Sequence, residues 1–533
     1  MTSSLIQNTA STPAASTVRD VTLDLMRSLG MTTIFGNPGS TELPMYRDFP
    51  DDFRYVLALQ ESVVLGVADG YALATGNAAF INLHSAAGLG HALGNLFTSY
   101  RNQTPLVVTA GQQSRSILPY EPFLFAERAT EFPRPYVKWS CEPARAEDVP
   151  AAIARAYYVA MQPPYGPTFV SIPVDDWDRP CPPLATRDVH ARYAGDPAVL
   201  AEAARAMAAA KKPTIVVNGG VARDGAWDGV ITLAERHQAP VWVAPLCGRN
   251  NFPEDHPLFA GFLPGDRAAI VARLGETDFI LTLGGPLSTY HVDGEGPHIP
   301  EGAHMIQLVN DPVAASWAPV GTSIVTDTAV GVAALLAGPE PAARSAPPRR
   351  PAPPALDMGG AFTDAHLMER LAALRPAGSV IVEEAPGSRG AMQARLPIID
   401  RDTFYTGASG GLGYGLPAAV GMAMGRPGEK IIALIGDGSS SYSIQALWTA
   451  AQQKLPISFV IVKNRRYEAL HHFGRHFGLD RTVGTELPDI DFCALARGYG
   501  VESFAAGSLE DIDGALLASF AAKGPTLVEV SVA

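Results

Sequence analysis

The stretch KIIALIGDGS, residues 430–439, places an apolar strand directly before the polar turn Gly436–Asp437–Gly438–Ser439. A helical stretch follows, and a second apolar strand, ISFVIVKN, ends at Asn464. Two parallel strands joined by a helix form a right-handed unit, so their carboxyl ends meet at one edge of the sheet. The pattern therefore predicts a parallel α/β fold in which Asp437 and Asn464, 27 residues apart, lie side by side.

The side chains at this edge are suited to a metal ion and phosphate groups. Asp437 and Asn464 offer hard oxygen ligands, and Mg²⁺ fills its remaining positions with phosphate oxygens, a carbonyl group and water. Glycines allow backbone N–H groups to approach a diphosphate closely. A GDGS segment alone is more often an ordinary turn after a strand. Asn464 at the end of the next strand makes a metal–diphosphate site the better interpretation.

The same alternation of short β-branched runs and Ala- and Leu-rich helical stretches continues along the chain, which is typical of parallel sheets covered by helices. The strand-like runs form three groups, at residues 32–35, 55–59, 79–83, 106–109 and 168–172, then 214–217, 241–244, 279–283 and 305–309, and then 380–382, 431–435, 457–462 and 527–530. We therefore expect three doubly wound parallel-sheet α/β domains, at residues 17–190, 191–338 and 358–533.

The segments between and before these domains have a different composition. Residues 339–357, PEPAARSAPPRRPAPPALD, are too rich in proline for a packed helix or a central strand, which predicts an extended linker. Residues 1–16 are rich in Ser, Thr and Ala without a basic and apolar leader, which predicts a flexible tail rather than a signal peptide.

The net charge, the positions of the cysteines and the lengths of the apolar segments disfavour several classes of function. The 533 residues carry a net charge of −13 and no basic run, so nucleic acid is not an expected partner. The four cysteines are far apart in sequence, which disfavours a zinc site or a disulfide framework. No uninterrupted apolar segment is long enough to span a membrane. We expect a cytoplasmic enzyme that binds neither nucleic acid nor membrane.

GDGS followed after 27 residues by Asn464 resembles the GDG…NN motif of thiamine diphosphate-dependent enzymes. Lys463 replaces the first Asn of that motif, whereas the second, the metal ligand of the family, is retained as Asn464. The resemblance implies thiamine diphosphate and Mg²⁺, which Ca²⁺ can replace. It also implies a metal held by Asp437, Asn464 and the backbone carbonyl of Arg466, and a cofactor contacted by Gly436, Gly438, Ser439 and Tyr467.

A second resemblance concerns the acid that activates the cofactor. FRYVLALQES, residues 53–62, is similar to the segment carrying the family's catalytic glutamate, which implies that Glu61 drives the aminopyrimidine toward its basic tautomer. Such an acid needs a dry, apolar slot. Apolar runs flank Glu61 on both sides, although a lone Glu at a strand end is usually solvated. In ASGGLGYGLPAA, the resemblance implies that Gly410 accepts from the aminopyrimidine and Leu412 supports the cofactor.

The most extensive similarity is to the benzoylformate decarboxylases within the thiamine diphosphate-dependent 2-oxo acid decarboxylases. It runs from about residue 17 to the C-terminus and includes IFGNPGSTELP, INLHSAAGLG, VTAGQQSR, VWVAP and YSIQALWTAAQ. It implies that Ser40 orients the substrate carboxylate, that His84 and His291 transfer protons, and that the substrate pocket contains Leu124, Pro386, Ala469, Leu470 and Phe473. Ser40 as a helix cap and His84 as a structural histidine are the ordinary alternatives.

Some positions depart from that family. Pro386 replaces a threonine near the reacting centre, His472 replaces a tryptophan, and Arg465–Arg466 replace a Gly–Thr pair. A proline offers neither a hydroxyl nor an N–H group. These departures predict a reshaped pocket, so the best substrate need not be phenylglyoxylate itself.

The expected activity is thiamine diphosphate- and Mg²⁺-dependent decarboxylation of an aryl 2-oxo acid to an aldehyde and CO₂, with carboligation as a side activity. The alternatives are a related enzyme acting on aliphatic or indole 2-oxo acids, or mainly a carboligase. A nicotinamide dehydrogenase is disfavoured because no GxGxxG opens a helix after a strand. A non-catalytic subunit would be expected to lack Glu61 or the metal pair. In the family, Glu61 and the diphosphate site belong to different chains, which implies a homodimer at least, and a tetramer is expected.

Overall fold

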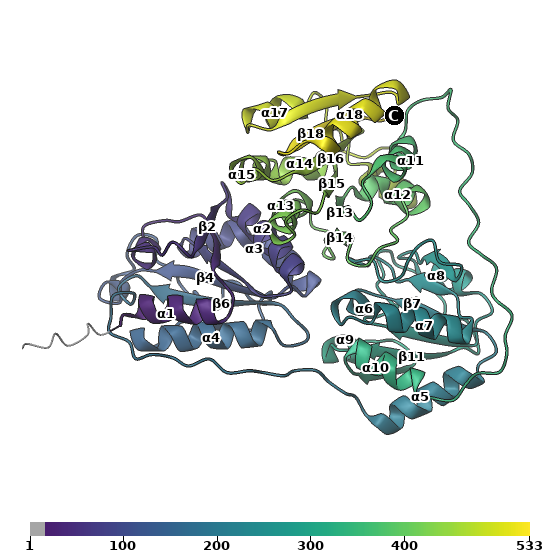
Figure 1. Cartoon of the computed structure of the whole chain (residues 1–533), viewed down its shortest axis with the longest axis horizontal. Coiled ribbons are helices and arrows are strands. Elements are labelled where there is room, and N and C mark those ends of the chain that lie inside the picture. The colour runs from purple at the N-terminus through teal and green to yellow at the C-terminus, as the bar shows by residue number, and fades with distance from the viewer. Residues whose placement is uncertain (1–15) are drawn as a thin grey trace, which may run out of the picture.

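The computed structural model describes residues 16–533, so the tail predicted for residues 1–16 lies, except for Ser16, outside the described part. Within it the chain forms three six-stranded sheets in which every pair of neighbouring strands is parallel. Figure 1 shows one sheet with its helices on the left, one at the top and one at the lower right. The expectation of three doubly wound parallel α/β sheets is confirmed.

The first sheet has the strand order β2-β1-β3-β4-β6-β5. Helices α1 and α4 cover one face and α2 and α3 the other, each with its own apolar core. The elements are α1 (Val18–Ser28), β1 (Thr33–Gly36), η1 (Leu43–Tyr46), β2 (Arg54–Leu57), α2 (Glu61–Thr75), β3 (Ala79–Leu83), α3 (Ser85–Asn102), β4 (Leu106–Gln112), η2 (Leu118–Tyr120), β5 (Ser140–Cys141), η3 (Ala146–Asp148), α4 (Val149–Ala160) and β6 (Pro167–Pro173).

The second sheet has the strand order β12-β11-β10-β7-β8-β9. Its first strand, β7, therefore lies at the centre, beside β10. The elements are α5 (Pro197–Ala209), β7 (Pro213–Val217), α6 (Gly220–Arg223), α7 (Trp227–His237), β8 (Val241–Val243), β9 (Phe259–Phe262), α8 (Arg267–Leu274), β10 (Phe279–Leu283), β11 (His304–Val309), α9 (Pro312–Ser316), β12 (Thr322–Val325) and α10 (Thr328–Leu336).

The third sheet has the strand order β14-β13-β15-β16-β18-β17. The elements are α11 (Asp364–Leu374), β13 (Val380–Glu384), η4 (Pro386–Ser388), α12 (Arg389–Arg395), β14 (Phe404–Thr406), α13 (Gly415–Gly425), β15 (Ile431–Gly436), α14 (Asp437–Ser443), α15 (Ala446–Gln452), β16 (Ile457–Lys463), α16 (Glu468–His476), α17 (Phe492–Gly498), β17 (Glu502–Ala506), α18 (Leu509–Ala521) and β18 (Thr526–Ser531).

The first and third sheets are joined by a shared apolar core around α2 and α13. These helices pack at backbone distance because glycines face the partner helix. A Cβ atom on Gly70 would collide with the Ala418 carbonyl group, and one on Gly421 with the Val67 carbonyl group. The Tyr414 hydroxyl donates to the buried Asp69 carboxyl group over 2.8 Å. The segment that begins at Glu61 is therefore fixed against the third sheet.

The proline-rich segment, residues 339–357, contains neither helix nor strand. It runs along the right edge of Figure 1 from the second sheet to α11. The guanidinium group of Arg344 holds it in place by donating to the carbonyl oxygens of Met207, Ala208 and Ala210, 2.6 to 3.0 Å away. Residues 339–357 are thus irregular in structure and are fixed to the end of α5 through Arg344.

Residues 16–533 include no helix that combines the length and apolar character required to cross a bilayer.

Candidate active site

The strand pairing of the third sheet brings Asp437 and Asn464 together. Strands β15 and β16 pair in parallel with Gly436 opposite Val462, so both polar residues follow at the same sheet edge. The Asp437 carboxylate accepts from the backbone N–H groups of Gly438, at 2.8 Å, and Arg465, at 2.6 Å. The neighbouring amide oxygen of Asn464 accepts from the Arg466 N–H group at 3.1 Å.

These residues form a site that fits a divalent cation and a diphosphate. Burial raises the pKa of the Asp437 carboxyl group, while backbone N–H groups of Gly438, Arg465 and Asn464 lower it. A nearby cation would offset the cost of burying that charge. A Cβ atom on Gly438 would collide with the ring of Tyr467, so only glycine allows this close packing at the start of α14.

Glu61 is the first residue of α2 and lies in the first domain. The helix starts there because the Gln60 side chain caps it, accepting from the Val63 N–H group at 3.1 Å. The Glu61 side chain is 12% exposed and lies 3.1 Å from His91 Nδ1 and 3.5 Å from Asn37 Nδ2. It is thus a mostly enclosed carboxylate with two nitrogen partners from the same domain.

His84 is the residue directly before α3, and its ring is held by a carboxylate that sequence reasoning missed. The Glu42 side chain is fully buried and lies 2.8 Å from His84 Nδ1. It also accepts from the N–H groups of Gly39 and Gly111, both at 2.9 Å. A carboxylate at Nδ1 fixes the ring so that Nε2 is the nitrogen left for proton exchange. In the sequence, the only sign of Glu42 is its position two residues after Ser40 in GSTELP.

Ser40 and Leu124 lie near this histidine. Ser40 is exposed in the turn before η1, and a Cβ atom on the preceding Gly39 would collide with the His84 ring. Leu124 adopts a φ of 64°, and its carbonyl oxygen accepts from Ser85 Oγ at 2.6 Å. Glu61 and His84 both contact the first turn of α3 at Gly88. The residues predicted from the first domain therefore form one cluster around the start of α2 and α3, which we call the first cluster: Ser40, Glu61, His84 and Leu124.

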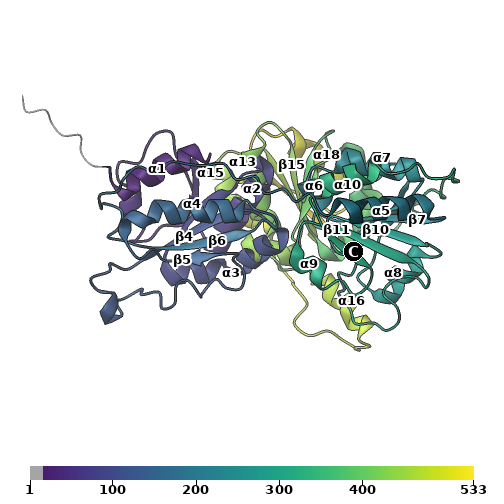
Figure 2. The same cartoon turned by 90° about the horizontal axis from the view of Figure 1, so that it is seen from below.

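The pocket residues of the third domain gather on α16. Phe473 stacks edge to face on the His291 ring from the second domain, with 4.6 Å between ring centroids. Figure 2 shows α16 on the same side of the molecule as α8 and α9. Leu470 is 48% exposed and Ala469 is half-buried. Pro386 is exposed, and the adjoining Gly387 packs against Glu468 at the start of the helix.

Two of the residues that depart from the family bind one carboxylate. His472 Nε2 lies 3.0 Å from Glu468 Oε1, and Arg466 Nε donates to the other oxygen of the same side chain. Arg475 adds a second guanidinium group at 3.7 Å. These contacts tie the turn after β16 to α16, so the departures at positions 466 and 472 act together rather than separately.

Gly410 and Leu412 lie in the loop before α13. Gly410 has a φ of +74°, which favours glycine, and Leu412 is half-buried. The loop is held by Glu384, a second carboxylate that sequence reasoning missed, which accepts from the N–H groups of Gly413 and Gly415. Burial raises the pKa of Glu384 to about 7, although these two donors oppose the shift.

The predicted site residues thus fall into two clusters. The second cluster comprises His291, Pro386, Gly410, Leu412, Gly436, Asp437, Gly438, Ser439, Asn464, Arg466, Tyr467, Ala469, Leu470 and Phe473. Across residues 16–533, no hydrogen bond, ion pair or ring contact links a member of the first cluster to a member of the second. An indirect link joins residues next to the two clusters, because Asn95 Nδ2 donates to the carbonyl oxygens of Ser62, at 2.7 Å, and Gly413, at 3.2 Å.

Comparison with protein families identifies the class of protein that this fold and site define. Residues 16–128 match the N-terminal TPP binding domain of thiamine pyrophosphate enzymes, residues 200–335 the central domain, and residues 388–530 the C-terminal TPP binding domain. The chain therefore belongs to the thiamine pyrophosphate (thiamine diphosphate) enzyme family.

Individual relatives define the type within that family. Benzoylformate decarboxylase from Pseudomonas aeruginosa is 42% identical over 519 residues, or 96% of this chain and 98% of the relative. A thiamine diphosphate-dependent 4-hydroxybenzoylformate decarboxylase from Rhodococcus jostii aligns with a TM-score of 0.94 and 41% identity, over 97% of this chain and 99% of that one. Benzoylformate decarboxylase from Polynucleobacter necessarius aligns with a TM-score of 0.95 and 40% identity, over 97% and 98%. The chain is a thiamine diphosphate-dependent 2-oxo acid carboxy-lyase of the benzoylformate decarboxylase type.

The contact between Glu42 and His84 leads to a prediction. Replacing Glu42 with Gln keeps the shape of the side chain but removes the charge that fixes the imidazole ring. We expect kcat to fall about 10- to 100-fold, because a misoriented histidine loses part of the roughly 10²- to 10⁴-fold that general acid–base catalysis contributes. Steady-state kinetics and the dissociation constant of thiamine diphosphate should be measured together. The cofactor constant should not change, because Glu42 contacts Gly39, His84 and Gly111 and none of the residues assigned to the metal or the diphosphate. Glu127→Gln, an exposed acid of the same domain, is the control. An unchanged kcat in Glu42→Gln would contradict this role.

Proposed function

We propose that this enzyme uses thiamine diphosphate and Mg²⁺ to convert an aryl-substituted 2-oxo acid to the aldehyde and CO₂. The observation that carries the proposal is the position of Asp437 and Asn464 at adjoining strand ends. Asp437, Asn464 and the Arg466 carbonyl group would hold the metal, with Ca²⁺ as an alternative ion. Gly436, Gly438, Ser439 and Tyr467 would surround the diphosphate.

When bound, thiamine diphosphate supplies a carbon nucleophile for the keto group and an electron sink for the departing CO₂. The residues of the chain bind, orient and transfer protons around it. Glu61 would hold a proton at the aminopyrimidine ring, Gly410 would accept from its amino group, and Leu412 would support the cofactor. Ser40 would orient the substrate carboxylate, and His84 and His291 would exchange protons with the reacting atoms.

We further propose that each active site is built from two chains, the first cluster from one and the second cluster from the other. The Glu61 carboxylate has nitrogen partners only from its own domain, among the residues that the structure describes. Apolar side chains beside both clusters are exposed, including Leu43 at 60%, Leu59 at 44% and Tyr442 at 56%. A second copy of the chain would cover such side chains. A homodimer is the minimum assembly, and a tetramer is the expected one.

The aryl preference rests on the apolar groups of Leu124, Leu470 and Phe473, which would enclose a ring. Burying the extra apolar surface of a ring is worth roughly 1.5–3 kcal/mol, or about 10- to 150-fold in kcat/KM over pyruvate. A panel of 2-oxo acids, assayed with thiamine diphosphate and Mg²⁺, should therefore rank benzoylformate and its ring-substituted forms above pyruvate.

Aliphatic or indole 2-oxo acids, or carboligation of two aldehydes as the main reaction, are the competing functions. Pyruvate used as well as benzoylformate would refute the aryl preference without affecting the cofactor assignment, and product analysis separates aldehyde release from carboligation. Pro386→Thr restores the residue type of the family and tests whether this position causes any departure from the expected ranking.

A further inference from the structure

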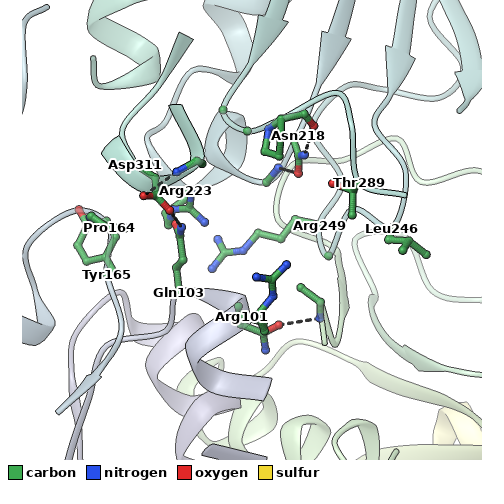
Figure 3. A pocket seen from close by; sticks show the side chains of 18 of the residues that line it. Arg101, Gln103, Pro164, Tyr165, Asn218, Arg223, Leu246, Arg249, Thr289 and Asp311 are labelled. Carbon is green, nitrogen blue, oxygen red and sulfur yellow. Dashed lines mark hydrogen bonds between the residues drawn. The ribbon is translucent and has the colours of Figure 1, made fainter. Parts of the chain in front are cut away.

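A cavity of about 280 Å³ lies where the three domains meet. Its walls include Arg101 and Gln103 from the end of α3, Arg223 and Arg249 from the second domain, and Thr406 and Ala408 from the third. Figure 3 shows the side chains of Arg101, Arg223 and Arg249 directed toward a common space. No residue of the first or second cluster lines the cavity. It is therefore separate from the proposed active site.

The cavity lies at the point of the second sheet where parallel α/β sheets bind ligands. Strands β7 and β10 are neighbours, but β7 leads to β8 on one side of the sheet and β10 leads to β11 on the other. The turns that follow them, Asn218–Gly220 and Gly284–Pro286, contribute to the cavity wall. Ligands of such sheets bind in the crevice outside the strand ends where the connections diverge. The strand order alone therefore predicts a ligand-binding crevice at this place, without reference to the charged side chains that line it.

The acidic groups around this cavity have partners of their own. The Asp311 carboxylate accepts from the N–H groups of Val313 and Ala314 and from Gln103 Nε2, the last at 3.1 Å. The Asp224 carboxylate accepts from Asn310 Nδ2 at 2.8 Å and from the N–H and hydroxyl groups of Thr328. Three guanidinium groups therefore face the cavity, while the two carboxylates already accept hydrogen bonds from other groups of the protein.

The guanidinium group of Arg223 has a buried hydrogen-bond donor that no group of the protein satisfies, among residues 16–533. Its Nε atom is buried without a hydrogen-bond partner, and so is the Oε1 atom of Gln103, among residues 16–533. Burial lowers the pKa of the Arg223 guanidinium group, Asp224 opposes that shift, and the like charge of Arg249 adds to it. Buried donors and charges without partners are costly, so such a group needs water, an ion or a ligand to satisfy it.

We propose that this cavity binds a compact oxyanion that can carry two negative charges, of the phosphate or dicarboxylate class. A guanidinium group matches both chemistries, because its paired N–H donors fit two oxygens of a phosphate or a carboxylate. A ligand with two charges would engage more than one of the three arginines. This proposal does not rest on the substrate or the metal assigned above.

The test is direct binding to the holoenzyme saturated with thiamine diphosphate and Mg²⁺, so that the diphosphate site is filled. Isothermal titration calorimetry with glycerol 3-phosphate, inorganic phosphate and succinate distinguishes an ester, a free phosphate and a dicarboxylate. At least one should bind in the wild type. Arg101→Gln and Arg249→Gln should each weaken its binding about tenfold or more, because each removes a charged hydrogen-bond donor.

Arg273→Gln is the matched control, since Arg273 is exposed on α8 of the second domain and does not line the cavity. It makes the same change of charge and should leave the affinity within about twofold of wild type. Arg101 is exposed at the end of α3, so its variant tests the cavity with little risk to folding. Absence of binding by all three probes, or equal weakening in Arg273→Gln and Arg101→Gln, would overturn the proposal.

Discussion

Asp437→Ala is expected to be inactive and to bind thiamine diphosphate at least about 100-fold more weakly than the wild type. The alanine methyl group provides no oxygen for the metal, and without the metal the diphosphate charge at the end of β15 is left uncompensated. Wild-type protein stripped with a chelator should regain activity only when thiamine diphosphate and a divalent metal are both returned. Asp437→Ala treated in the same way should not recover.

Cofactor affinity, measured by calorimetry or by quenching of intrinsic fluorescence, separates this effect from a catalytic one. Asp513→Ala is the control in the same domain, because it breaks only the partly exposed ion pair with Arg370, for which about 0–1 kcal/mol of stability is expected. Full activity of the stripped wild type, or of Asp437→Ala, would remove the basis of the proposed cofactor site.

A mixture of Glu61→Ala and Asp437→Ala chains is expected to recover about a quarter of wild-type activity, although each variant alone is nearly dead. Glu61→Ala loses the acid that acts on the aminopyrimidine ring, at a cost of about 10²- to 10⁴-fold. If each site takes Glu61 from one chain and Asp437 from the other, a mixed dimer has one site with both lesions and one with neither. Random pairing makes about half of the dimers mixed, each with one intact site of two.

A mixture of Glu61→Ala and His84→Ala chains is the matched control. Both lesions lie in the first cluster, so in a mixed dimer each site carries one of them and no activity should return. Subunit exchange must be shown in both mixtures, for example by mass spectrometry of differently tagged chains. If exchange occurs and the Glu61→Ala and Asp437→Ala mixture stays inactive, Glu61 acts within its own chain or is not the activating acid.

The strands that could be predicted from the sequence differ physically from those that could not. All thirteen predicted runs are strands, with ends shifted by up to a few residues. The five strands that were missed, β5, β9, β12, β14 and β17, are all at sheet edges. Central parallel strands are buried on both faces and therefore read as apolar runs. The five missed strands have only two to five residues, and four of them have partly exposed side chains, so no such run marks them. The edge strand β2 was predicted because it does carry an apolar run, YVLAL.

The residues of the candidate site also differ in whether the sequence alone could place them. Asp437 and Asn464 could be paired from sequence because the connection between parallel strands has a fixed hand, which brings successive strand ends to one edge. Glu42 and Glu384 could not, since their partners lie up to 69 residues away along the chain, at Gly111 and at Gly413. A carboxylate surrounded by backbone N–H groups in the folded protein has no local sequence pattern.

The sequence by itself determined the three parallel sheets and the meeting of Asp437 and Asn464 at one sheet edge, because apolar periodicity and the handedness of the βαβ unit are local properties. Only the tertiary structure decided which charges are buried together. Glu42 beside His84, Glu468 between Arg466 and His472, and three arginines around one cavity all result from packing between distant segments. Electrostatic energy depends on separation in space and on exclusion of water, and neither quantity can be read from positions along a chain.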